Sequence, residues 1–448
     1  MSHTRPALPL DGSRPSRRSV LKGAVTTAGL LTLPGALAAC GGSSSPSSGS
    51  GGGGSVAGST ITFGSNYSDP APKEAFQALV DNATTATKVK VKVNTTDHNT
   101  FQNNINNYLQ GTPDDLFTWF AGYRMQFFAQ QGLLAPIDDV WDKIGSNFND
   151  AAKSLSQGLD KKYYLVPLYN YPWVIFYNKS VFADKGYTVP ATWDDFIALA
   201  KKMKTDGLVP LAFADKDGWP ALGTFDIINL RVNGYDYHIK LMKHEVPWTD
   251  KGVTDVFNQW AELMPYMQSG ANGRIWQDAA KALENKQAGM MFQGSNQVAA
   301  NYDPKNLPDL DFFPYPVINT TWAQDFMDAP ADGFCLSAKA KNADAAKKIL
   351  EYIGTGDAEA TYLKTDSWDV GLAQGLNAPT YNDIQKKAVT AISACKSVSQ
   401  FMDRDTDPGF ASNVMIPSIQ KFIDNPSTSN IKSLQTSIES QAKSIFTS

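Results

Sequence analysis

The chain of 448 residues is poor in the residues that build metal centres. It has four histidines and they are far apart in the sequence: His3, His98, His238 and His244. The last two are separated by six positions, so they do not share a helical face as metal-binding histidine pairs do. We therefore expect no metal site and no cofactor.

Cysteine is scarce as well, with three residues in the whole chain. Two of them, Cys335 and Cys395, lie far from the N-terminus. In an extracytoplasmic protein such a pair can form a disulfide. It can equally remain as two free buried thiols, which behave as small apolar side chains. The sequence leaves both alternatives open.

Long hydrophobic runs are missing. The uncharged segment from Ala24 to Ala39 has 16 residues, fewer than the ~20 that a helix needs to cross a bilayer. Positively charged residues before such a segment and small residues at its end are typical of an export signal. Residues 16–22, SRRSVLK, resemble a twin-arginine signal, and residues 37–40, LAAC, resemble the lipobox of bacterial lipoproteins. We expect residues 1–39 to be a signal peptide and Cys40 to carry lipid at the outer face of a bacterial membrane.

Residues 40–58 consist of this cysteine and a run rich in Gly and Ser, which predicts a flexible linker. About 390 residues then remain for the folded body, which is more than one ordinary core and predicts two lobes. Without the signal the chain has 35 Lys and Arg against 43 Asp and Glu, a net charge of −8. That charge argues against nucleic acid and anionic lipid as partners.

Sequence motifs of hydrolases, metalloenzymes and phosphate-binding loops are missing too. Residues 403–407, DRDTD, alternate carboxylates as calcium loops do, but the sixth and twelfth positions are Pro408 and Val414 instead of Gly and Glu. We interpret this segment as a loop that lines a cleft. The chain is therefore not expected to be an enzyme.

Alternating hydrophobic patterns are present at the start of the folded body. Short apolar runs predict strands at 61–63, 89–93 and 116–119, and helical spacing predicts helices at 72–79, 98–109 and 125–131. This β-α-β-α-β order predicts a parallel sheet covered by helices. Later, residues 165–178 predict extended chain with a kink, Thr192 caps a helix, and Asn342 caps another that stops at Gly354.

Four segments resemble the extracellular solute-binding proteins of carbohydrate ABC transporters, in the family's order. They are PDDLFTWFAGYRMQFFAQQGLLAPID (113–138), YYLVPLYNYPWVIFYNKSVFADKGYTVPATWDDF (163–196), KQAGMMFQGSNQ (286–297) and ADGFCLSAKAKNADAAKKILEYI (331–353). The resemblance implies an α/β, two-lobed periplasmic-binding-protein-like fold of type II, with a hinge and an interlobe ligand cleft. It places lobe 1 at 59–172 plus 317–364 and lobe 2 at 173–316 plus 365–448. It also implies a monomer that delivers a carbohydrate ligand to an ABC transporter permease.

A sugar needs flat aromatic surfaces for its ring and polar side chains for its hydroxyls. Side chains of both kinds follow the expected strands. The candidates are Asn66, Asp97, Trp119, Tyr123, Tyr169, Tyr171, Trp173, Trp219, Asp226, Asn296, Asp332, Trp368, Arg404 and Asp405. We assign a role in packing to five other tryptophans: Trp141, Trp193, Trp248, Trp260 and Trp276.

Three alternatives remain at this level. The cleft of a binding protein can take a polyamine, a peptide or an iron complex in place of sugar. A lipid-anchored glycosidase needs only two carboxylates in a cleft. The third alternative is a surface-structural lipoprotein, but such a protein does not need two lobes around a polar, aromatic cleft.

Overall fold

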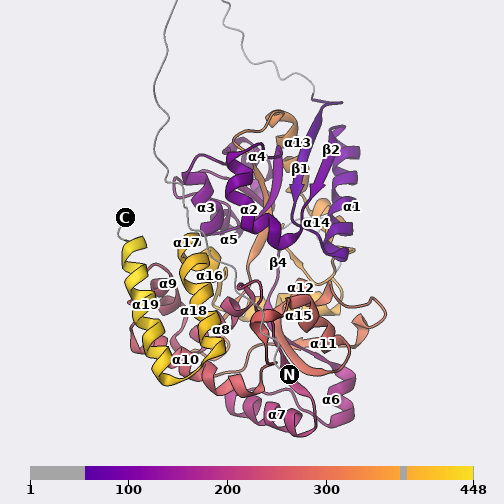
Figure 1. Cartoon of the computed structure of the whole chain (residues 1–448). Helices are drawn as coiled ribbons and strands as arrows, with labels where there is room; N and C mark the ends of the chain where they lie inside the picture. Colours follow the sequence, from indigo (N-terminus) through magenta and orange to yellow (C-terminus); the bar gives the residue numbers. More distant parts are fainter. Residues whose placement is uncertain (1–55, 374–380, 447–448) are drawn as a thin grey trace, which may run out of the picture. The chain divides into compact units, whose positions relative to one another are not determined.

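The chain is described by a computed structural model that covers residues 56–373 and 381–446 (Figure 1). The expected signal peptide, Cys40 and all but the last residues of the Gly/Ser-rich linker lie outside the described residues. Within those residues, no helix has both the length and the hydropathy of a membrane span.

The first sheet has six strands in the order β11-β4-β10-β3-β1-β2. They are β1 (Thr60–Ser65), β2 (Lys90–Thr95), β3 (Leu116–Phe120), β4 (Leu165–Asn170), β10 (Ala331–Leu336) and β11 (Val370–Gly371). β1 pairs in parallel with β2 and β3, whereas β10 is antiparallel to β3 and β4. The predicted β-α-β-α-β start of the chain is confirmed in order and type, with helices longer than expected.

Helices of the first half of the chain, drawn in indigo and purple in Figure 1, accompany this sheet together with two helices from later in the sequence. They are α1 (Pro70–Thr87), α2 (His98–Gln110), α3 (Tyr123–Gln130), α4 (Asp138–Ile144), α5 (Asp150–Leu155), α13 (Ala343–Ile353) and α14 (Gly356–Leu363). Hydrophobic periodicity explains their packing. In α1, Ala75, Phe76, Leu79, Val80 and Ala83 lie on one stripe and are buried.

The second sheet has four strands in the order β6-β7-β5-β8. They are β5 (Trp173–Asn178), β6 (Val209–Ala212), β7 (Ala288–Gly294) and β8 (Leu310–Phe313). β5 is buried along its whole length and runs antiparallel to both of its neighbours. The helices between these strands are α6 (Lys179–Lys185), α7 (Trp193–Thr205), α8 (Pro220–Asn233), α9 (Tyr235–Met242), α10 (Lys251–Leu263), α11 (Trp276–Glu284) and α12 (Ser295–Ala299). As predicted, Thr192 caps α7, because its side chain accepts from the backbone N–H of Asp195.

The chain passes from the first sheet to the second through Tyr171 and Pro172, between β4 and β5. A separate two-stranded sheet pairs β9 (Phe326–Asp328) with β12 (Ser397–Ser399). β11 returns to the edge of the first sheet at residues 370–371. The exact division of the chain into two lobes stays a prediction.

The C-terminal part is helical, and two pieces of it are joined by a π-helical turn. The elements are α15 (Asp383–Ala394), α16 (Met402–Asp405), α17 (Pro408–Phe410), η5 (Ala411–Met415), α18 (Ile416–Asp424) and α19 (Thr428–Phe446). Single 3₁₀ turns elsewhere are η1 (Gly145–Asn147), η2 (Met264–Tyr266), η3 (Ala271–Gly273) and η4 (Leu307–Asp309).

The structure decides one alternative that the sequence left open and corrects one expectation. Cys335 and Cys395 are free thiols and are not bonded to each other. Cys335 is buried within β10, whereas the Cys395 thiol lies against the carbonyl oxygens of Gln324 and Ala391. Asn342 precedes α13 but does not cap it, because its side-chain amide donates to the carbonyl oxygen of Thr60 instead.

Candidate functional site

Two adjoining hollows lie where the two sheets face each other, and they share His98 and Gln297 in their walls. The Arg404 hollow is lined by His98, Gln102, Phe120, Arg124, Tyr171, Trp173, Trp219, Gln297, Phe401, Asp403 and Arg404. The Asn66 hollow is lined by Asn66, Tyr67, Ser68, Asp69, Pro72, His98, Tyr169, Trp276, Asn296, Gln297, Ala300 and Asp332. We refer to the two together as the cleft.

Strand ends explain why these residues meet. Asn66 directly follows β1, and Phe120 is the last residue of the parallel neighbour β3. Asp332 is near the start of β10, which runs the opposite way, so it reaches the same edge of the sheet. In the second sheet, Trp173 begins β5 and pairs with Gly294, the last residue of β7. Ligands of open α/β sheets bind at such edges.

Arg404 is the most densely bonded side chain of the cleft. Its guanidinium donates to Asp332 at 2.8 Å, to the hydroxyl of Tyr171 at 2.8 Å and to the carbonyl oxygen of Ala331 at 3.2 Å. The guanidinium carbon also lies 4.3 Å from the ring centre of Phe120. Burial opposes its charge, but Tyr171 and Asp332 raise the pKa of Arg404 above its usual value. The guanidinium is therefore a fixed cation in the wall of the cleft.

A second arginine, Arg124, is held in the same wall. It pairs with Asp403 at 2.8 Å and donates to Gln102 at 2.8 Å. Its guanidinium lies over the rings of Trp119 and Phe120, at 4.8 and 4.9 Å from their centres. Both arginines are thus oriented by carboxylates and aromatic faces before any ligand binds.

Several buried polar atoms at the cleft have no hydrogen-bond partner among the described residues. They include Arg404 Nε, Asp403 Oδ1, Gln297 Oε1, Asn296 Oδ1, Trp276 Nε1 and the hydroxyl oxygen of Tyr67. Buried polar groups of folded proteins are almost always paired. A concentration of unpaired donors and acceptors beside a hollow is therefore what a site for a hydroxylated ligand requires.

Aromatic rings supply the apolar part of the wall. The Trp219 ring lies between those of Trp173 and Trp276, with centres 6.3 and 6.0 Å away. Its Nε1 donates to Asn99 at 3.1 Å, which ties the start of α8 to α2. Phe401 packs on Trp173 with ring centres 4.7 Å apart. Flat surfaces of this kind suit the weakly apolar face of a pyranose ring.

Asp369 stands immediately behind the cleft. It is fully buried, and neither of its carboxylate oxygens has a hydrogen-bond partner among the described residues. Burial raises the pKa of Asp369, and the neighbouring Asp366 and Asp332 raise it further, while the side chain of Asn296 lowers it. Asp369 is not among the residues that line either hollow.

The structure brings eight of the fourteen predicted residues to the cleft: Asn66, Tyr169, Tyr171, Trp173, Trp219, Asn296, Asp332 and Arg404. Their role in binding stays a prediction. The other six do not line either hollow: Asp97, Trp119, Tyr123, Asp226, Trp368 and Asp405.

Asp226 and Asp405 accept from the backbone N–H groups of Met402 and Gln400, and the other four exceptions also have local reasons. Asp97 caps α2 by accepting from the backbone of Thr100. Trp119 and Trp368 point into hydrophobic cores, where they are 1% and 5% exposed. Tyr123 begins α3, outside both hollows.

Sequence reasoning also missed residues of the cleft. Trp276 was assigned to packing, because it begins a helix, but that helix start faces the Asn66 hollow. His98, Gln102 and Arg124 lie on helices, where periodicity alone does not tell which turn meets a cleft.

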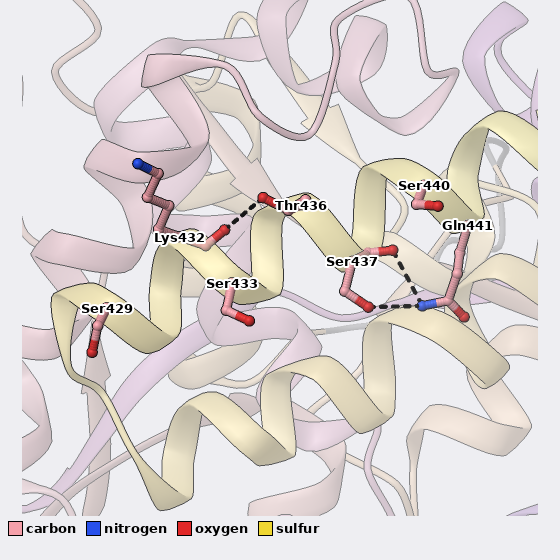
Figure 2. A pocket seen from close by; sticks show the side chains of 7 residues that line it. All are labelled: Ser429, Lys432, Ser433, Thr436, Ser437, Ser440 and Gln441. Carbon is pink, nitrogen blue, oxygen red and sulfur yellow. Dashed lines mark hydrogen bonds between the residues drawn. The ribbon is translucent and has the colours of Figure 1, made fainter.

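Larger hollows lie elsewhere on the surface. Figure 2 shows one along α19, lined by exposed Ser, Thr, Lys and Gln side chains. Two of these side chains donate within the helix itself: Thr436 to the carbonyl oxygen of Lys432, and Gln441 to Ser437. Another, of about 800 Å³, separates Ala261–Gly273 from the end of α18. Neither contains the buried charges or unpaired tryptophan donors of the cleft.

Comparisons with known proteins agree with this geometry. The family "Bacterial extracellular solute-binding protein" matches residues 67–360. An uncharacterized ABC transporter extracellular-binding protein of Pyrococcus horikoshii is 28% identical over 294 residues, 64% of this chain and 65% of the relative. A multiple sugar-binding protein of Streptococcus mutans is 26% identical over 53% of this chain and 61% of its own. The chain thus spans slightly less than two thirds of these curated relatives.

Among solved structures, the bacterial solute receptor AcbH is 75% identical, with a TM-score of 0.85 over 87% of this chain and 99% of that chain. It is described as having an exclusive substrate preference for β-D-galactopyranose. A chitin oligosaccharide binding protein, 20% identical with a TM-score of 0.76, shares the fold.

Proposed function

Because this chain belongs to the family of bacterial extracellular solute-binding proteins, we propose that it captures a monosaccharide of the β-D-galactopyranose type in the cleft. The observation that carries the proposal is the 75% identity to AcbH across 99% of that receptor. The bound sugar is then delivered to the permease of an ABC transporter. No chemical step is assigned to the chain, since the matched relatives are binding proteins.

The chemistry of the cleft supports a sugar. Trp219, Trp173 and Trp276 offer aromatic faces, and Asn296, Gln297 and Arg404 offer polar atoms without partners. A hexose presents a ring face and a rim of hydroxyls that both donate and accept, so it matches both sets. A polyamine requires anionic surroundings, whereas this wall contains two arginines, each paired with a carboxylate.

The size of the cleft supports a small ligand. The indole N–H of Trp219 reaches Asn99 on the opposite side, and Arg124 bonds Asp403 on the C-terminal segment. These contacts cross the opening between elements of the two sheets and leave little room for a second ring. We infer that the Trp219–Asn99 contact closes over a single sugar ring.

The membrane attachment rests on the sequence. We propose that the twin-arginine signal exports the chain and that Cys40 becomes a lipid-modified N-terminus. The Gly/Ser-rich residues up to 58 would then tether a two-lobed binding body to the outer face of the membrane.

The experiment is isothermal titration calorimetry and thermal unfolding of residues 55–448, the compact unit of the chain, with D-galactose, its epimers D-glucose and D-talose, a disaccharide and putrescine. Galactose at a hundred times its Kd should stabilise the protein by ~2.7 kcal/mol. Trp219→Ala should lose this shift and keep the wild-type circular dichroism spectrum. Trp322→Ala is the matched control, because Trp322 is also half-buried and hydrogen-bonded but lies outside the cleft.

A response to putrescine or a peptide, with silence from every sugar, would refute the carbohydrate proposal and leave the family membership intact. A disaccharide that binds as tightly as galactose would refute the single-ring inference.

A further inference from the structure

Buried polar contacts on the side away from the cleft hold the segment that contains Arg404. We call residues 399–406 the Arg404 segment; it comprises the end of β12, Gln400, Phe401, α16 and Thr406. The backbone N–H of Met402 donates to Asp226 Oδ2 of α8 at 2.6 Å. The Thr406 hydroxyl donates to the carbonyl oxygen of Met242, at the end of α9, at 2.6 Å. The cleft side of this segment is therefore positioned by residues that never reach the cleft.

The backbone of this segment is strained. Phe401 has a φ of 105°, in the left-handed region that a bulky residue rarely adopts. Such a conformation is unfavourable and persists only where its surroundings enforce it. The contacts behind the segment thus hold Phe401 against Trp173 and direct Arg404 toward Asp332.

Two buried carboxyls lie at the centre of these contacts. Asp226 of α8 and Asp328 of β9 are both fully buried. Asp226 Oδ1 and Asp328 Oδ2 have no hydrogen-bond partner among the described residues. The other oxygen of Asp328 accepts from the hydroxyl of Ser399, at the start of the Arg404 segment. Both carboxyls therefore contact the segment directly.

Arg231 is a nearby cation that lowers the pKa of Asp328, but its hydrogen bonds go to other groups. Arg231, on the same helix as Asp226, directs its guanidinium to the carbonyl oxygens of Tyr315 and Phe326 and to Gln324. Arg404 is bonded to Asp332, and Arg124 to Asp403. The remaining acidic neighbours, Asp403 and Asp405 of α16, add negative charge.

His238 of α9 completes the cluster. Its Nδ1 lies 3.2 Å from the side-chain amide nitrogen of Asn229, whose oxygen already accepts from Asn233. That amide must therefore donate to Nδ1, so the ring proton is on Nε2, the nitrogen 3.7 Å from Asp405 Oδ2. His238 lowers the pKa of Asp328, but burial outweighs this effect.

Two buried carboxyls that have no directly bonded cation cannot both ionise at low cost. Burial, followed by the charge of Asp328, raises the pKa of Asp226 well above its usual value. Burial also raises the pKa of Asp328 to about 6. Both shifts favour a proton on this coupled pair in the folded protein.

We propose that Asp226 and Asp328 are positioning residues that retain a shared proton and, by doing so, hold the Arg404 segment in its ligand-binding geometry. When that proton leaves to solvent at alkaline pH, the two charges repel each other, the segment loosens and sugar affinity falls. This inference rests on the proposed function, because the affinity that changes is that of the cleft.

The test is the galactose Kd of residues 55–448 measured by calorimetry from pH 6 to pH 9. Wild type should weaken tenfold or more over this range. In Asp226→Asn the amide oxygen still accepts from Met402 but the side chain is neutral at every pH, so the weakening should shrink to less than threefold. Asp383→Asn, a fully exposed carboxylate, is the matched control and should follow wild type.

A second measurement needs no ligand. Hydrogen exchange of peptides covering residues 399–406, corrected for the intrinsic effect of pH, should show protection at pH 6 that is lost at pH 9 in wild type and kept in Asp226→Asn. If no sugar binds but this exchange behaves as described, the proposed function fails and the positioning role stands.

Three results would overturn the inference: a wild-type Kd and exchange pattern that do not change with pH, an Asp226→Asn variant weakened equally at every pH, or an alkaline loss that disappears in His238→Gln but remains in Asp226→Asn. The second result would mean that Asp226 has a merely structural role. The third would mean that the proton lost at alkaline pH belongs to His238.

Discussion

At the scale of single residues, the cleft depends on charges that are paired before a ligand arrives. Arg404 and Asp332 are each 7% exposed in their side chains and bond at 2.8 Å. A buried ion pair contributes little relative to an apolar pair, but removal of one partner leaves the other charge uncompensated. The pair therefore determines both the shape of the wall and its tolerance to substitution.

Asp332→Ala should lower the free energy of unfolding by about 3–5 kcal/mol, because Arg404 is left as a buried cation without its carboxylate. Urea denaturation followed by circular dichroism measures this change, and sugar affinity should be lost with it. Asp383→Ala, which removes an exposed carboxylate, should change stability by less than about 0.5 kcal/mol. An equally small effect of Asp332→Ala would show that Arg404 finds other compensation.

At the scale of secondary-structure elements, the cleft depends on how closely helix α8 approaches its neighbours. Gly223 lies inside this helix, where a Cβ atom would be 2.5 Å from the Trp173 ring and 2.8 Å from Phe401. Both rings line the Arg404 hollow. The missing side chain thus lets the helix support the aromatic wall directly.

Gly223→Ala should weaken galactose binding, because the new methyl group displaces Trp173 and Phe401. An exposed helical Gly→Ala change is usually favourable by up to about 1 kcal/mol, but overpacking here should cost about 1–3 kcal/mol. Calorimetry and thermal unfolding measure the two effects. Gly273→Ala is the control, since a Cβ there meets nothing within 4 Å. Unchanged affinity in Gly223→Ala would mean that the rings can move without consequence.

At the scale of the whole molecule, buried carboxyls make stability depend on pH. Burial raises the pKa of Glu359 to about 8, although the backbone N–H groups of Ala373 and Leu372 lower it. Burial likewise raises the pKa of Asp366 to about 7. Between the unfolded and folded pKa values, the folded protein holds a proton that the unfolded chain has released. Stability is therefore greatest at the acidic end of this window and is lost as the pH rises through the folded pKa.

The urea midpoint should accordingly fall between pH 5.5 and pH 8.5, and the fall should be smaller in Glu359→Gln, whose side chain cannot ionise. Glu245→Gln, an exposed position, should reproduce the wild-type dependence. A wild-type midpoint that rises over this range would show that His98, whose pKa burial lowers to about 4, outweighs the buried carboxyls.

The spacing of hydrophobic residues and the local residue chemistry were sufficient to predict much of the fold and part of the cleft. The apolar spacing in residues 61–119 predicted the alternating strands and helices, because burial of one face imposes that period in any fold. Asn66, Trp173 and Asn296 were predictable as cleft residues, since each lies at a strand end, where ligands of α/β proteins bind. Four ordered segments were sufficient to predict the family.

Only the tertiary structure decided which aromatic side chains face the cleft and which fill a core. Trp119 is buried in a core and Trp276 reaches the cleft, the reverse of the prediction, because the choice depends on which helix packs across each strand end. The same holds for Arg404 with Asp332, 72 positions apart, and for Asp226 with Met402, 176 apart. Such pairs form between strands and helices that chain folding brings together, and neither partner has a local pattern that specifies the other.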